Sequence, residues 1–313
     1  MKIIEDLQIE VPDTNAHHWD IKSYSQDSLE EVLFYGYNAS SNSNLLNNYS
    51  SFKRRMYFNN WAPCEYAQPK VDDTSFFNEI YSICPYTSNW LNEEERSQRW
   101  RSIFYPYNKS IIPKKYEKEY DVIYHGGIHG QEHVDCLNVM KSFNYRYCTM
   151  TSYINASTHA MIPFATNLNL NFQEKINLVA KSKISICYNI IHVFNDHVPN
   201  IQSHDNWESN KAFSEVGKRN IAPQFKTRIH EAAISRTLNL VMRDDWNIIE
   251  EYYEPYKDFV YFNDPTDLRY KIEDILNNWG DYQNMIENAF EKSKKYTIEN
   301  FVNKIKNYEM QRM

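Results

Sequence analysis

Two basic side chains stand at the start of a predicted helix, where the backbone itself carries partial positive charge. The apolar spacing predicts this helix over 225–236, and Lys226 and Arg228 fall in its first turn. Cations there oppose the helix dipole unless an anion lies beside them, and a diphosphate would be such an anion, with Arg228 donating two parallel hydrogen bonds. Thr227 and Glu231 share one side of the helix, and Glu231 could accept hydrogen bonds from a ribose hydroxyl pair. The alternative is an Arg228–Glu231 ion pair on a solvated helix face.

A glycine-rich turn forms the second candidate site. The segment 125–130, HGGIHG, holds three of the six glycines and joins a predicted strand to a helix predicted over 131–143. Glycine lets backbone N–H groups approach a phosphate closely, and the helix that follows presents its positive end. We therefore predict that Gly126 and Gly127 bind the phosphates of the same ligand and that Asn189 lines its pocket. The alternative is an ordinary strand–helix turn.

Other residue patterns point away from metal and hydrolase chemistry. His125, His129 and His133 stand four residues apart and resemble a metal-binding set, but the intervening glycines interrupt the helix that would align them. We predict no metal site, and we assign the acidic pair at 244–245 a structural or capping role. The sequence contains neither GxxxxGK[ST] nor G-x-S-x-G, which excludes P-loop and α/β-hydrolase sites of those types.

The elements that must position these residues alternate between strand and helix. Strands are predicted at 121–125, 146–149, 184–191, 238–242 and 259–262, and helices at 131–143, 174–181, 225–236, 248–253, 281–296 and 298–310. A further helix follows Asp264, a favourable N-cap, with Pro265 at its first position. Such alternation predicts a doubly wound α/β domain, whose ligands bind outside the carboxyl ends of the strands. Both candidate sites fall there.

The first third of the chain is less regular. Strands are predicted at 33–37, 55–59, 82–85 and 103–106, with a helix over 88–99 and a polar linker over 108–119. Across all 313 residues, the hydrophobic content of 42% excludes wholesale disorder, and the net charge of -7 excludes a globally basic nucleic-acid coat. The five cysteines are scattered without CxxC, which favours a reducing compartment. With no signal peptide or long apolar run, we expect a soluble, cytoplasmic protein.

The C-terminal half resembles a known enzyme family. The run TRIHEAAISRTLNLVMRDDWNIIEEYY, followed by DFVYFNDPTDLRYKIEDIL, is similar to GT-B glycosyltransferases, closest to the group-1 family that includes CgeB-like proteins. The resemblance implies two Rossmann-like domains facing a central cleft, a diphosphate contact at Arg228 and a ribose contact at Glu231. The Glu-x7-Glu spacing of retaining group-1 enzymes is absent, because Asn239 lies eight residues after Glu231. Retention and inversion therefore both stay open.

The N-terminal third carries a second resemblance. The segments RRMYFNNWAPCEYAQ, YSICPYTSNWLN and SIFYPYN are similar to the acceptor halves of α1,3-fucosyltransferase-like GT-B enzymes. An inverting mechanism would need a base to deprotonate the acceptor hydroxyl. Glu65, in this third of the chain, is the first candidate, and His129, in the glycine-rich turn, is the second. We expect an acceptor-binding domain over 1–118, a donor-binding domain over 119–295 and a final helix, 296–313, that returns to the first domain.

These features together predict a glycosyltransferase. It would move a sugar from a UDP- or GDP-type nucleotide diphosphate sugar to an acceptor hydroxyl, with neither metal nor cofactor. The acceptor could be a glycan, a protein or a modified nucleic acid. Basic clusters interleaved with tryptophans in the first third keep a viral DNA-modifying glycosyltransferase open. A non-catalytic protein that binds nucleotide sugar or nucleic acid is the other alternative.

Overall fold

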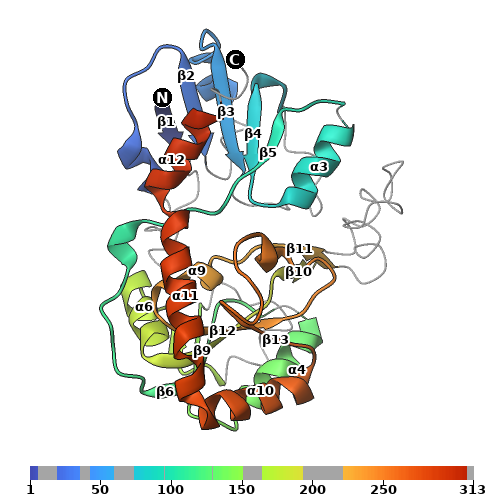
Figure 1. Cartoon of the computed structure of the whole chain (residues 1–313). Helices are drawn as coiled ribbons and strands as arrows, with labels where there is room; N and C mark the ends of the chain where they lie inside the picture. The colour runs from blue at the N-terminus through green and yellow to red at the C-terminus, as the bar shows by residue number, and fades with distance from the viewer. Residues whose placement is uncertain are drawn as a thin grey trace.

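Two parallel β-sheets, one in each half of the chain, organise the structure (Figure 1). This computed structural model describes residues 1–5, 20–35, 43–59, 74–94, 96–128, 130–150, 164–192 and 221–308. The first sheet has five strands and the second has six, and every strand pair within either sheet is parallel. The predicted α/β class is confirmed.

The second sheet has a reversal of strand order at its centre. Its strands are β6 (Tyr120–His125), β7 (Tyr145–Thr149), β8 (Asn167–Leu168), β9 (Ser182–Cys187), β12 (Leu238–Met242) and β13 (Val260–Phe262). They lie in the order β13-β12-β9-β6-β7-β8, so the chain winds outward in both directions from β6 and β9. The carboxyl ends of β6 and β9 therefore form the switch point where doubly wound sheets bind ligands.

Helices pack on this sheet through apolar stripes. They are α4 (Gly130–Met140), α6 (Phe172–Ala180), α9 (Arg228–Ile234) and α10 (Pro265–Asn277), while α11 (Gln283–Ser293) packs against α9. Asp264 caps α10 by accepting a hydrogen bond from the Asp267 N–H, with Pro265 at the start, as the sequence predicts. A capping box between Asn171 and Glu174 begins α6 in the same manner.

Two predicted elements near the site have different bounds. The strand predicted at 184–191 ends at Cys187, and the chain then forms β10 (Ile190–His192), which pairs antiparallel with β11 (Ile221–Pro223). The helix predicted from 225 begins only at Arg228, and the Lys226 N–H donates to the side chain of Asn189. Lys226 therefore precedes the helix instead of lying in its first turn.

The first sheet keeps its strands in chain order. They are β1 (Lys2–Glu5), β2 (Glu31–Tyr35), β3 (Arg54–Asn59), β4 (Glu79–Ser82) and β5 (Trp100–Ser102). The sequence pattern missed β1 and set β4 and β5 about three residues late, because it followed apolar runs and passed over the charged Glu79 and Arg101. The described segments between β2 and β3 and between β3 and β4 pack on one face of this sheet, as right-handed crossovers between sequential parallel strands predict. That face is a separate hydrophobic cluster containing Val32, Phe34 and Ile80.

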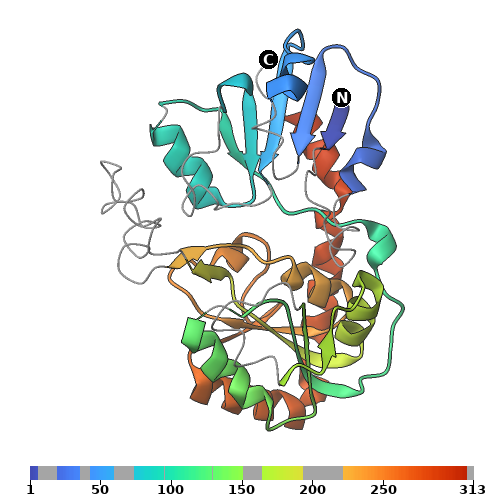
Figure 2. The same ribbon diagram turned by 180° about the vertical axis from the view of Figure 1, so that it is seen from behind.

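The opposite face of the first sheet is covered by the end of the chain. Helix α12 (Ile298–Asn307) lies beside this sheet in both views (Figures 1 and 2). The rings of Phe58 and Phe301 are 4.7 Å apart between centroids. Buried Arg54 donates from Nη2 to the backbone oxygen of Ile305 over 3.0 Å, which satisfies a carbonyl at the helix end. The first sheet is therefore completed by residues from the far end of the sequence.

Shorter elements connect these parts. The α-helices α1 (Ser43–Asn47) and α3 (Pro85–Glu94) belong to the first half. Single 3-10 turns occupy Asp20–Tyr24, Thr74–Phe76, Lys109–Ile111, Ile248–Glu251, Trp279–Tyr282 and Lys294–Tyr296. The helices predicted at 88–99 and 248–253 correspond to α3 and to the fourth of these turns. In the described parts of the chain, no helix has the length and apolar character needed to cross a membrane.

Candidate functional site

Arg228, the first residue of α9, lies over the turn that follows β6. Its Nη2 atom is 2.3 Å from the point where a Cβ at Gly126 would stand, and Gly126 has a φ of +135°. The guanidinium carbon lies 4.7 Å from the centroid of the Tyr124 ring, a cation–π contact. Gly126 therefore makes room for Arg228. Its own N–H donates to the Cys148 oxygen over 2.9 Å, so the predicted phosphate contact through this amide would require that hydrogen bond to break.

Tyr124 also fixes the second glycine of the turn. Its hydroxyl donates to the Gly127 oxygen over 2.6 Å. Burial raises the pKa of Tyr124, and the nearby Arg228 cation opposes this rise only in part. The phenol therefore stays protonated and holds the turn in one conformation beneath the guanidinium.

Lys226 is the second cation at this position, and Asn189 holds its backbone. Asn189 is 1% exposed, and its Oδ1 accepts from the Lys226 N–H over 3.1 Å. The Asn189 carbonyl accepts from the Gln224 N–H over 2.7 Å, while the Lys226 ammonium contacts the Gln224 side-chain oxygen. Burial, and then repulsion from Arg228, lowers the pKa of Lys226 to about 7. Its charge is therefore sensitive to a bound anion.

Glu231 has different partners from those that the sequence suggests. It is 2% exposed, and its Oε1 lies 2.9 Å from Nζ of Lys175 on α6, while its Oε2 lies 3.0 Å from Nδ1 of His125. The Nε2 atom of His125 lies 3.2 Å from the Ser185 hydroxyl. Burial lowers the pKa of His125, with Glu231 opposing, so the ring is neutral. The alternative of an Arg228–Glu231 pair on an exposed face is therefore wrong, and a ribose contact at Glu231 stays a prediction.

The cations Lys226 and Arg228 give the switch point positive charge that no nearby carboxylate of the described residues neutralises. Glu231 is already neutralised by Lys175. Among the residues that the structure describes, neither Arg228 nor Lys226 has a carboxylate within 4.0 Å. Both are half-buried at the carboxyl ends of the central strands, where an uncompensated charge is costly. The arrangement can hold an anion with two or more charges.

A small pocket opens beside these cations. It is lined by Tyr188, Asn189, Ile190, Ile221, Met242, Arg243 and Asp244. The Asp244 Oδ1 accepts from the N–H groups of Trp246 and Asn247 and so holds a local turn, which is the structural role that the sequence allows for it. Tyr188 packs against His133 with ring centroids 4.0 Å apart and the ring planes tilted by 34°. The sequence pattern gave no sign of Tyr188, Met242 or Arg243, because pocket residues on separate strands share no spacing.

The remaining predicted residues fall into two groups. Glu65 and His129, the candidate bases, lie outside the described residues. Thr227 occupies the N-cap position of α9 but makes no side-chain capping hydrogen bond. Within the described ranges, no three His, Cys, Asp or Glu residues gather as a metal site would require.

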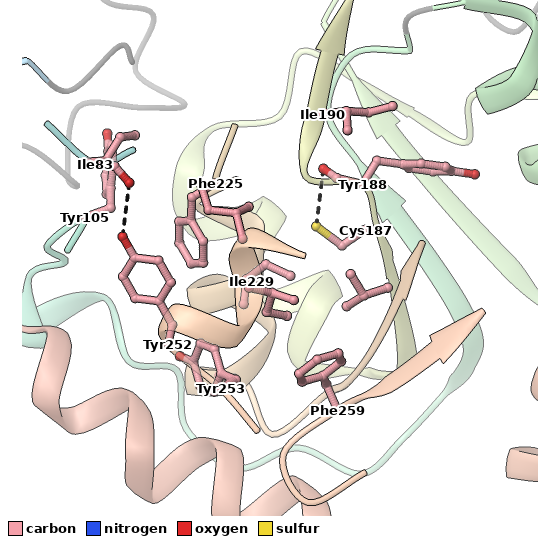
Figure 3. Close-up of a cluster of buried hydrophobic side chains, with 14 of the residues drawn as sticks. Ile83, Tyr105, Cys187, Tyr188, Ile190, Phe225, Ile229, Tyr252, Tyr253 and Phe259 are labelled. Atoms are coloured by element: carbon pink, nitrogen blue, oxygen red, sulfur yellow. Dashed lines mark hydrogen bonds between the residues drawn. The ribbon is translucent and has the colours of Figure 1, made fainter. Parts of the chain in front are cut away.

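The segment after β12 connects the site to the first half of the chain. The Tyr252 hydroxyl donates to the Ile83 oxygen over 3.2 Å (Figure 3), and the Tyr86 hydroxyl donates to the Trp246 oxygen over 3.1 Å. Tyr252 also packs on Phe225, with centroids 4.1 Å apart. Phe225 immediately precedes Lys226, so this contact joins both halves of the chain to the candidate site.

Solved structures share this arrangement of two parallel sheets. TarM gives a TM-score of 0.55 at 13% identity, covering 93% of this chain and 57% of TarM. HepE from Anabaena, in complex with UDP, gives 0.57 at 9% identity, covering 89% of this chain and 78% of HepE. The fold is of the GT-B type. The pneumococcal O-GlcNAc transferase GtfA, in complex with UDP and GlcNAc, gives 0.54 at 7% identity, with 93% and 58% of the two chains covered.

The chain spans a little over half the length of TarM. No protein-family model matches the sequence, and no curated protein matches it. At these identities, the GT-B likeness describes the fold.

Proposed function

We propose that this GT-B protein is a glycosyltransferase that moves a sugar from a nucleotide diphosphate sugar to an acceptor hydroxyl. The observation that carries the proposal is the pair Lys226 and Arg228, two cations without a carboxylate partner among the described residues, at the switch point of a doubly wound sheet. A diphosphate matches this site in charge and in its demand for several hydrogen-bond donors.

The proposed chemistry uses this charge on the leaving group. Transfer breaks the bond between the anomeric carbon and a β-phosphate oxygen, so negative charge grows on the diphosphate. Fixed cations aimed at growing charge in a water-poor site lower the barrier. Arg228 would donate two parallel hydrogen bonds, and Lys226 would add a second charge whose protonation the diphosphate favours. These two side chains would supply the neutralisation that a divalent metal provides elsewhere.

The small pocket beside the cations is the proposed place for the nucleoside. Met242 offers an apolar surface in this pocket, and Asn189 connects the pocket to the backbone of Lys226. HepE and GtfA were both solved with UDP, which supports a uridine-type donor over a GDP-type one. We further propose that the acceptor enters a cleft between the two sheets, with Glu65 or His129 as the candidate base.

The test compares two ligands on one variant. Arg228→Ala should weaken UDP binding by about 1.5–3 kcal/mol, the range for hydrogen bonds to charged groups, while uridine binding changes little. Isothermal titration calorimetry measures the affinity for both ligands. A separate assay follows sugar transfer from UDP- and GDP-sugars. Arg236→Ala is the matched control, because Arg236 follows the same helix but pairs with Glu287 at 3.0 Å. Equal weakening of UDP and uridine by Arg228→Ala would contradict the proposal.

A further inference from the structure

The partners of Glu231 raise a question about charge at the proposed diphosphate site. Arg228 and Glu231 stand three residues apart on α9, a spacing at which opposite charges on a helix pair readily. Yet the guanidinium of Arg228 lies over Gly126 and the Tyr124 ring. Something must hold the carboxylate away from it.

Lys175 is the residue that does so. Its ammonium comes from the neighbouring helix α6 and lies 2.9 Å from Oε1 of Glu231. Its side chain is 16% exposed and the carboxylate is 3% exposed, so water screens the pair little. The Lys175 ammonium also lies 4.7 Å from the Phe172 ring centroid, which fixes its position further.

His125 cannot replace Lys175. Its Nδ1 lies 3.0 Å from Oε2 of Glu231, but burial lowers the pKa of His125, so the ring brings no charge. Among the residues that the structure describes, Lys175 is therefore the cation that pairs with Glu231. Without it, the nearest cation on the same helix is Arg228.

Resting on the proposed function, we propose that Lys175 is a positioning residue for the diphosphate. It acts through Glu231: by pairing with that carboxylate, it leaves the charge of Arg228 available for the donor. Lys175 itself touches no substrate. Its removal should therefore affect ligands that carry phosphate and spare those that do not.

The experiment is a double-mutant cycle read by ligand binding. UDP and uridine are titrated at about pH 8, above the ordinary histidine pKa of about 6.5, so that His125 stays neutral. Lys175→Met should weaken UDP about tenfold or more and leave uridine within about twofold. Lys175→Met/Glu231→Gln removes both charges and should restore UDP affinity, and Lys175→Arg should resemble the wild type.

The arms separate this inference from competing explanations. The inference is overturned if Lys175→Met weakens the binding of UDP and of uridine equally. It is also overturned if the double variant folds but does not recover UDP binding. If Lys175→Met does not fold, the inference is tested by Lys175→Arg and by the double variant, which carries neither charge. Both must bind UDP with wild-type affinity, and weaker UDP binding by either one would overturn the inference. If Glu231→Gln weakens the binding of uridine as much as that of UDP, the carboxylate binds the ribose. This result would also overturn the inference. A wild type that binds no nucleoside diphosphate overturns the proposed function as well.

Discussion

The guanidinium of Arg228 occupies the space that a side chain at position 126 would need. The two residues lie about a hundred positions apart in the chain, one in the turn after β6 and one at the start of α9. Gly126 combines a left-handed φ of +135° with this close approach, so two independent constraints require glycine there.

Gly126→Ala should therefore displace Arg228 and strain the turn. We expect a loss of about 1–3 kcal/mol in the free energy of unfolding, measured by denaturant titration, together with weaker UDP binding. Gly280→Ala is the control, because a Cβ at Gly280 meets no atom within 4 Å and should change the free energy of unfolding by less than about 0.5 kcal/mol. Equal effects of both substitutions would contradict the role of Gly126.

Lys226 should give diphosphate binding a pH dependence. Burial and Arg228 lower its pKa to about 7, so in the free protein its charge is lost as pH rises through 7. UDP affinity should fall between about pH 7 and pH 9, and binding in that range should take up a proton. Titration calorimetry in buffers of different ionisation enthalpy measures both quantities. Lys226→Arg should bind without this decline because its guanidinium stays charged, and a wild-type affinity that is flat over the range would refute the role.

The buried pair of Arg54 and Glu79 should matter for stability. Their side chains lie 3.0 Å apart between Nη2 and Oε2, each 8% exposed. Arg54→Met would leave the buried Glu79 carboxylate with Arg101 alone, at 4.0 Å, and we expect a cost of about 3 kcal/mol in the free energy of unfolding, the lower end of the range for breaking a buried pair. Lys53→Met, which removes a fully exposed pair with Glu30, should have almost no effect.

At low pH, the contribution of Arg54 to the free energy of unfolding should decrease. Burial alone would raise the pKa of Glu79, but hydrogen bonds from Arg54 and Tyr81 outweigh it and hold this pKa below its usual 4.5. A carboxyl with a lowered pKa contributes stability above 4.5 that is lost as pH falls through its folded-state value. The difference in the free energy of unfolding between wild type and Arg54→Met should therefore narrow as pH falls from above 4.5 through the folded-state pKa of Glu79 in the wild type. A gap that is constant with pH would show that packing, not charge, is lost.

Removing divalent ions tests the proposed metal independence. Because Lys226 and Arg228 would neutralise the leaving diphosphate, EDTA should leave sugar transfer largely intact, as followed by release of UDP. Complete loss of transfer that Mn²⁺ or Mg²⁺ restores would instead point to acidic ligands on the enzyme.

The sequence predicted the second half of the fold well because its signals there are local. Apolar spacing located β12 at its exact bounds, and Asp264 with Pro265 marked the start of α10. The first half was harder, because β4 and β5 contain Glu79 and Arg101, charged residues that a strand tolerates only when another strand supplies their partners. Such partners lie too far away in the sequence for a pattern over a few neighbouring residues to indicate them.

The candidate site shows the same division. Lys226 and Arg228 stood out because two cations at a helix start are locally unfavourable. Glu231 was correctly placed on α9, but its partners Lys175 and His125 come from other elements, and no spacing along the sequence connects them. Pairings between elements have to be read from the folded chain.

The position of α12 has a consequence for how the protein folds during synthesis. The last strand of the first sheet ends at Ser102, but the helix that covers the second face of this sheet starts at Ile298, about 200 residues later. At about 5–20 residues per second, a ribosome needs roughly 10–40 s to cover that distance. Throughout this interval Leu33, Met56 and Phe58 face water or a chaperone. The half of the protein that is made first is therefore expected to finish folding last.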